Sequence, residues 1–172
     1  MRFARGFVAA IVLGLIAVFA AVWFGYVPAA ADNPKPSGLE RWAARRALNT
    51  TIAREMPRPP YPFPMNDAAT VAGAKLYMQN CAVCHGSGVG EESNISKGMY
   101  VQPPQLNKHG VDDDPEGETY WKIEHGIRFT GMPSFAGILT EEQIWQLTAF
   151  LKHDPKDLPP AAAAEWNKPH GD

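Results

Sequence analysis

The stretch Asn80–Gly88 reads NCAVCHGSG and holds the only two cysteines of the 172-residue chain. Two residues separate Cys81 from Cys84, and His85 follows the second cysteine directly. Two thiols and an imidazole within five consecutive residues indicate a chemical task, because groups this close in sequence stay close in space. The question that decides the fold is which task uses all three side chains.

Four chemistries use cysteines at this spacing, and three of them leave part of the motif unexplained. A thioredoxin-like redox pair is expected near a strand–helix–strand pattern, and none is visible in the sequence. A structural zinc site takes about four ligands, but the chain has no third cysteine and its other histidines are scattered singly. A disulfide between Cys81 and Cys84 would close so short a loop that it would stabilise little. Covalent haem attachment uses both thiols for thioether bonds and His85 as the proximal iron ligand.

The charge of the chain is unevenly distributed along the sequence. The formal net charge is only −2, so the basic footprint typical of nucleic-acid binding is missing and we predict no nucleic-acid partner. From residue 66 onward, fifteen acidic and eight Lys or Arg residues give a net charge of −7, whereas residues 28–65 carry a net charge of +3. An acidic face can attract a basic partner, and a solvated surface that only aids solubility is an equally good interpretation.

The N-terminus carries a long apolar run, Phe7–Val27, preceded by Arg2 and Arg5. This run is longer than the roughly 18 residues that a bilayer-spanning helix needs, whereas signal-peptide apolar regions usually have about 7–15 residues. Ala29–Ala31 offers an A-x-A cleavage site, so a cleaved signal peptide stays an alternative. We favour a membrane anchor over residues 1–31, and both interpretations export the rest of the chain.

Residues 32–65 are predicted to be a linker. Ser37 and Glu40 form an S-x-x-E capping box, which predicts a helix that begins at Ser37. This helix either lies on the membrane surface or is a solvated linker helix. The run PRPPYPFP that follows Met56 cannot continue a helix, and it is predicted to be a stiff, extended spacer on which the next domain could swing.

Residues 66–155 are predicted to form one helical domain, because they contain helical patterns and no strand with convincing alternation. The first helix is capped by Asn66 or Asp67 and leads directly into the cysteine motif. The second, within EGETYWKIEHG, ends at Gly126, and the third is capped by Thr140.

Two stretches show no helical pattern. Residues 86–115 are rich in Gly, Pro, Ser and Asp, and a loop of this length in a compact domain is unusual unless a bound group supplies the missing core. Residues 156–172 are predicted to be an extended C-terminal tail.

The ligand opposite His85 decides what a haem at this site does, because methionine, histidine or an open position gives different functions. Met132 lies in TGMPSF, between two predicted helices, where Gly131 lets the backbone approach and Pro133 fixes the turn. We therefore predict Met132 as the second iron ligand. The remaining candidates are Met99, His109 and His125.

From about Asp67 to Asp154 the chain resembles a class I c-type cytochrome domain of the bacterial kind. The resemblance rests on four segments in this order: AGAKLYMQNCAVCHG, PPQL, YWKIEHGIRFTGMPSF and TEEQIWQLTAFL. It implies an all-α cytochrome c fold, a small helical bundle wrapped around one covalent haem c, to which the N-terminal transmembrane helix is added. It does not cover residues 1–65 or 156–172.

The resemblance also implies roles for residues outside the cysteine motif. The Pro104 carbonyl would accept a hydrogen bond from the Nδ1–H of His85, and Leu106 would pack on the haem ring. Such bonding orients a metal ligand and tunes the metal. Trp121 or Arg128 would contact a haem propionate, although a core aromatic and a solvated surface charge are the plainer interpretations of these two.

The predicted function is electron transfer by a membrane-tethered mono-haem c-type cytochrome, not an enzyme, which exchanges electrons with a donor and an acceptor protein in a periplasmic respiratory chain. The resemblance places the haem domain on the periplasmic side of the inner membrane, although the basic residues just after the apolar run favour the opposite orientation. The alternative is a haem c subunit of a larger membrane dehydrogenase or oxidase complex. A catalytic or gas-binding haem protein needs an open iron position, against which Met132 argues.

Overall fold

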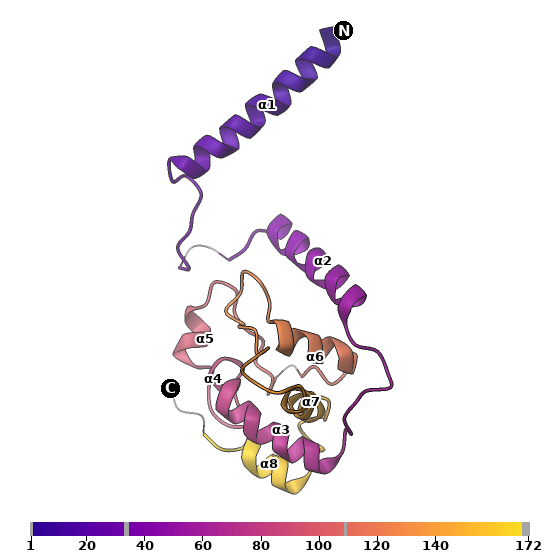
Figure 1. Cartoon of the computed structure of the whole chain (residues 1–172). Helices are drawn as coiled ribbons and strands as arrows, with labels where there is room; N and C mark the ends of the chain where they lie inside the picture. The colour runs from indigo at the N-terminus through magenta and orange to yellow at the C-terminus, as the bar shows by residue number, and fades with distance from the viewer. Residues whose placement is uncertain (1, 33–34, 109, 170–172) are drawn as a thin grey trace. The chain divides into compact units, whose positions relative to one another are not determined.

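All regular structure in the described part of the chain is helical, and no strand forms beyond one isolated bridge between Ala136 and Leu139. The predicted all-α class is therefore confirmed (Figure 1). The computed structural model describes residues 2–32, 35–108 and 110–169.

The chain divides into two units, Met1–Asn33 and Pro34–Asp172. The first unit is built on α1, Arg2–Trp23, of which Phe3–Trp23 is long and apolar enough to cross a membrane. The helix ends before the apolar sequence does, because Gly25 adopts a φ of 73°, which breaks the helical conformation. Among the residues that the structure describes, this is the one helix that could cross a membrane.

The second unit begins with α2, Gly38–Glu55, which starts where the capping box predicts. The Ser37 hydroxyl accepts a hydrogen bond from the Glu40 N–H at 3.2 Å, which satisfies one of the unpaired donors of the first turn. The helix ends at Met56, just before Pro57. Near that end Ile52 is buried, and α2 contacts α6, Glu116–His125.

The Pro-rich segment after α2 packs on the helical domain, and we call residues 57–63 the linker strap. The Tyr61 ring lies 4.6 Å from the Trp145 ring, measured between centroids, and Phe63 packs against the same core. The Pro57 carbonyl lies so close to Gly117 that a Cβ there would come within 2.1 Å of its oxygen. These contacts correct the expectation of a free spacer, since apolar side chains of the segment are partly buried on the domain.

Three helices of the domain begin and end at the predicted signals. The Asn66 side chain accepts from the Ala69 N–H at 3.0 Å and begins α3, Asp67–Asn80. Gly126, with a φ of 66°, ends α6. Thr140 begins α7, Glu141–Leu151, through a reciprocal capping box in which the Gln143 side chain accepts from the Thr140 N–H.

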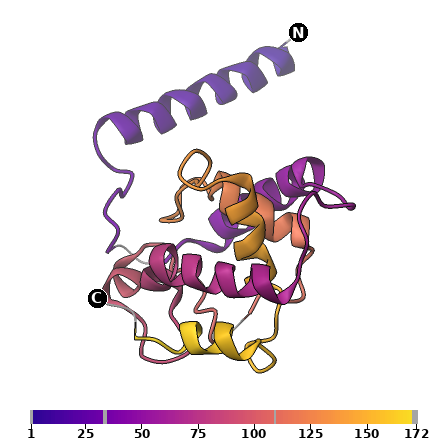
Figure 2. The same ribbon diagram turned by 60° about the horizontal axis from the view of Figure 1, so that its bottom comes forward.

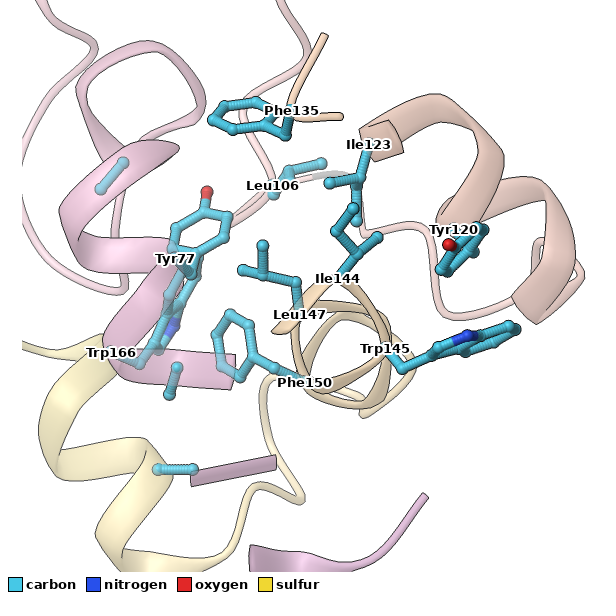
Figure 3. Close-up of a cluster of buried hydrophobic side chains, with 13 residues drawn as sticks. Tyr77, Leu106, Tyr120, Ile123, Phe135, Ile144, Trp145, Leu147, Phe150 and Trp166 are labelled. Atoms are coloured by element: carbon cyan, nitrogen blue, oxygen red, sulfur yellow. The ribbon is translucent and has the colours of Figure 1, made fainter. Parts of the chain in front are cut away.

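The domain is organised around the crossing of α3 and α7. Gly73 lies at the crossing, where a Cβ would come within 1.9 Å of the Gln146 carbonyl oxygen, so the two backbones meet directly. Because no side chain separates the helices there, their larger residues interdigitate on either side. Figure 3 shows the resulting core, in which Tyr77 of α3 faces Leu147 and Phe150 of α7.

Two short helices lie in stretches predicted to be irregular. Asn94–Gly98 forms α5 within the long loop, capped by the Ser93 hydroxyl. Pro160–Trp166 forms α8, which packs on α3 (Figures 1 and 2), and its Trp166 ring also packs on Phe150 of α7, with centroids 5.5 Å apart. The structure corrects the expectation of an extended tail for this part, because burial of Ala162 and Trp166 stabilises a helix too short to form alone.

Candidate functional site

The cysteine motif forms one helical turn directly after α3. Cys81 caps the end of α3, and α4, Ala82–His85, follows without a break. The N–H groups of Cys84 and His85 both donate to the Cys81 carbonyl, at 3.0 and 2.9 Å. This turn presents two thiols and an imidazole from within five residues on a hydrogen-bonded backbone.

Both cysteines are free thiols. Burial, and to a smaller extent the neighbouring Cys84, raises the pKa of the Cys81 thiol to about 12, and burial also raises the pKa of Cys84. A redox-active cysteine pair needs a thiol whose pKa is lowered, so that a thiolate is present at neutral pH. The environment of these thiols therefore disfavours the thioredoxin-like interpretation.

His85 is held by a hydrogen bond at Nδ1, which lies 2.9 Å from the Pro104 carbonyl oxygen. The carbonyl can only accept, so Nδ1 carries the proton and the lone pair of the ring is on Nε2. Burial lowers the pKa of His85, while the bond to Pro104 opposes that shift. The neutral imidazole therefore presents Nε2 as a ready metal ligand at neutral pH.

The segment around Pro104 is fixed to the motif by its backbone as well. The Leu106 N–H donates to the His85 carbonyl at 2.9 Å, and the Leu106 side chain is buried in the core. The Gln105 amide donates to the Cys84 carbonyl at 2.9 Å. The structure thus brings Pro104 and Leu106 together with the cysteine motif, from about twenty residues away in sequence.

Tyr77 is a residue of the site that the sequence did not identify. Its hydroxyl donates to the Gly86 carbonyl at 2.7 Å, although the ring is fully buried. This bond ties the end of the motif to α3, at a point where Gly86 adopts a φ of 77°. The available signal was the position of Tyr77 one helical turn before Cys81, on the same face.

Met132 lies in a tight turn after α6. The Ile127 N–H donates to the Met132 carbonyl at 3.2 Å, and the Met132 N–H donates to the Thr130 hydroxyl at 3.1 Å. The Met132 side chain is partly buried against the hydrophobic core that also contacts Cys81. Its thioether therefore reaches the same core as the cysteine motif from a separate loop.

The other ligand candidates have different surroundings. Met99 caps the C-terminal end of α5. Its side chain packs on Gly131, the residue before Met132. The His125 ring is stacked on Trp121 with centroids 4.7 Å apart, and its Nδ1 lies 3.2 Å from the Trp121 carbonyl oxygen. His109 lies outside the described residues.

The two residues considered as propionate contacts, Trp121 and Arg128, differ in their burial. Trp121 is buried in α6, and its indole N–H has no hydrogen-bond partner within the described residues. Arg128 is exposed. A buried indole N–H usually finds a partner, so a propionate contact of Trp121 stays a prediction.

Within the described ranges, no group of three or more His, Cys, Asp and Glu side chains could hold a metal ion. The zinc interpretation therefore finds no ligand set in this part of the chain. The donor set that the structure does offer fits a covalent haem c: two free thiols on one turn, an imidazole with Nε2 available, and a thioether from another loop.

Comparisons with known proteins bear on the same part of the chain. The sequence model of the family described as "Cytochrome C oxidase, cbb3-type, subunit III" matches residues 68–151. Cytochrome c6 of Parathermosynechococcus lividus is 32% identical over 79 residues, which are 46% of this chain and 83% of that protein. The cbb3-type cytochrome c oxidase subunit FixP of Rhizobium etli is 35% identical over 113 residues, which are 56% of this chain and 35% of that protein.

A further relative is the quinohemoprotein alcohol dehydrogenase ADH-IIG of Pseudomonas putida, 36% identical over 107 residues, which are 59% of this chain and 13% of that protein. The chain spans about a third of the FixP protein and most of the cytochrome c6. No solved structure matches the chain.

Proposed function

Because the chain belongs to the class I c-type cytochromes, we propose that it is a membrane-tethered electron-transfer protein with one haem c bound to Cys81 and Cys84 and ligated by His85 and Met132. Membership of the family confirms the predicted cytochrome c fold and the covalent haem c. It also indicates that the function is electron transfer. The observation that carries the residue assignment is the turn of α4, where His85 stands beside two free thiols with its Nδ1 held by Pro104.

The proposed ligands account for one-electron chemistry. Haem c, when bound, supplies an iron that alternates between the ferrous and ferric states. The Pro104 carbonyl fixes the His85 ring and raises the basicity of the ligating nitrogen. Met132 offers a soft, weakly donating sulfur that raises the reduction potential, and the surrounding apolar core disfavours the extra charge of the ferric state.

We propose that the protein carries electrons and does not itself catalyse a reaction. If His85 and Met132 both ligate the haem iron, they would leave no coordination position for a substrate or a gas. Electron transfer still requires a donor and an acceptor protein, and the acidic domain, with its net charge of −7 from residue 66 onward, would attract a basic face on such a partner.

For the location we propose the inner membrane, with α1 as a single span and the haem domain in the periplasm. The apolar stretch Phe3–Trp23 supports the span by length and composition. Covalent haem c attachment on the outer side of bacterial membranes, which the family resemblance implies, supports the orientation.

The packing of the linker strap limits how this protein can reach its partners. Because residues 57–63 are attached to the domain through Pro57 and Tyr61, the Pro-rich segment does not serve as a swinging spacer. The connection between α1 and α2 is then residues 24–37, which can extend over at most roughly 50 Å. We propose that the haem domain works within that distance of its anchor.

The match to subunit III of cbb3-type oxidases favours a second candidate, a haem c subunit of a larger membrane complex. A short connection to the membrane suits this alternative as well. Purification in mild detergent at native expression level separates the two, because a carrier elutes alone and a subunit elutes with partner chains.

The proposed chemistry is tested by a potentiometric titration of the detergent-purified full chain. We expect one Nernstian transition with a slope of one electron, and a fall of the midpoint potential in Met132→His, since histidine donates more strongly than methionine. An unchanged potential in this variant would contradict Met132 as an iron ligand.

A further inference from the structure

The thioether of Met99 lies beside the turn that carries Met132. A Cβ placed on Gly131 would lie 2.7 Å from the Met99 sulfur and 2.9 Å from its terminal methyl carbon. The end of the Met99 side chain therefore lies directly over the Gly131 backbone, although the two residues come from different parts of the chain.

Gly131 is needed here for space and not for an unusual backbone conformation. It does not adopt a positive φ, unlike Gly86 and Gly126. An alanine would fit its backbone angles, but its methyl group would collide with Met99. The missing side chain thus permits the contact between Met99 and the Met132 turn.

Met99 is itself anchored to the cysteine motif through α5. Its N–H donates to the Ser96 carbonyl at 3.2 Å. The Ser96 hydroxyl accepts from the Gln105 amide at 3.0 Å, and the same amide donates to the Cys84 carbonyl. The Ser93 hydroxyl, which caps α5, donates to the Val83 carbonyl within the motif.

We propose that Met99 is a positioning residue, which packs on Gly131 and holds the Met132 turn in place relative to the cysteine motif. Its contact joins α5, tied by hydrogen bonds to the motif that carries His85, to the turn that carries Met132. The inference rests on the proposed function, in which Met132 binds the iron. Met99 acts by packing, and its sulfur is not the ligand.

The test is the affinity of imidazole for the ferric, haem-loaded full chain, because imidazole binds only when the Met132 sulfur leaves the iron. In Met99→Ala the turn loses its support, and we expect imidazole to bind about tenfold more tightly, in line with the loss of part of one partly buried side chain. In Met99→Leu, which keeps the packing volume and removes the sulfur, we expect the affinity to stay within about twofold of the parent.

Gly131→Ala tests the contact from its other side. We expect it to raise the imidazole affinity as Met99→Ala does. We also expect the double variant to bind imidazole no more tightly than either single variant, because both changes remove the same contact. Gly98→Ala and Ile95→Ala are the controls. Gly98 has nothing within 4 Å of a new Cβ and Ile95 is 52% exposed, so both should leave the affinity unchanged.

The outcomes separate this inference from the proposed function. If Met99→Ala binds imidazole as the parent does, while Met132→Ala loses the sulfur-to-iron absorption band, the positioning role is wrong and the proposed function stands. If Met99→Leu loses that band, Met99 is the ligand and the positioning role is wrong. If the parent has no such band, both proposals fall.

Discussion

At the scale of single residues, the site depends on hydrogen bonds to main-chain carbonyls around the cysteine motif. The clearest is the bond from the fully buried Tyr77 hydroxyl to the Gly86 carbonyl. Burial, reinforced by the neighbouring cysteines, raises the pKa of Tyr77, so the phenol stays neutral and donates. The Tyr77 ring also packs on Phe150 and Trp166, with centroids 5.3 and 5.2 Å away.

Removing this hydroxyl leaves a buried carbonyl without its donor. We expect Tyr77→Phe to lower the free energy of unfolding by about 1–3 kcal/mol, measured by chemical denaturation of the haem-loaded protein. The matched control is Tyr100→Phe, whose hydroxyl makes only long contacts of 3.3 and 3.5 Å to Glu40 and should change stability little. Equal effects of the two changes would contradict a specific role for the Tyr77 bond.

The residues that the sequence identified and those it missed differ in one respect. Cys81, Cys84 and His85 lie within five residues, so spacing alone reveals them. The sequence offers Met99 only as a candidate ligand, and its contact with Gly131 appears only in the fold. Gln105 likewise reaches the cysteine motif only in space, and no periodic pattern marks it.

At the scale of elements, the close crossing of α3 and α7 fixes the core beside the motif. Gly73 lets the helices approach until the Gln146 carbonyl nearly touches its Cα. The opposing atoms belong to backbone, which cannot rotate away as the end of a long side chain can.

We expect Gly73→Ala to destabilise the domain by about 3 kcal/mol or more, or to prevent folding, because overpacking at a backbone contact cannot relax locally. The yield of haem-loaded protein and its thermal unfolding measure the effect. Gly38→Ala, where a new Cβ meets nothing within 4 Å, should behave like the parent. A fully stable Gly73→Ala protein would mean that the crossing is looser than the structure indicates.

Local signals predicted the helices whose ends are capped in sequence. Ser37, Asn66 and Thr140 begin helices in the structure as their side chains indicate. The short helix α8 escaped prediction because it has no side-chain cap and depends on burying Trp166 beside Tyr77. The linker strap escaped for the same reason, since tertiary contacts and not local preferences hold it in place.

At the scale of the whole molecule, the attachment of the linker strap makes α2 part of the haem domain. Pro57 against Gly117 and Tyr61 on Trp145 are the contacts that hold it. The haem domain of this protein therefore includes the linker helix α2.

We expect Gly117→Ala to release the strap, because its Cβ would overlap the Pro57 carbonyl. Trypsin should then cleave after Arg54 faster than in the parent, while the haem spectrum stays the same. Gly98→Ala serves again as the control. An unchanged cleavage rate would contradict a strap held at Gly117, and a changed spectrum would mean that the strap also shapes the site.

The central claim is that this protein is an electron-transfer cytochrome whose iron is ligated by both His85 and Met132. Absorption spectra of the full chain, oxidised and reduced, with and without carbon monoxide, test it most directly. We predict low-spin bands, a far-red sulfur-to-iron band that disappears in Met132→Ala, and carbon monoxide binding only in that variant. A high-spin spectrum or ready carbon monoxide binding by the parent protein would contradict the claim.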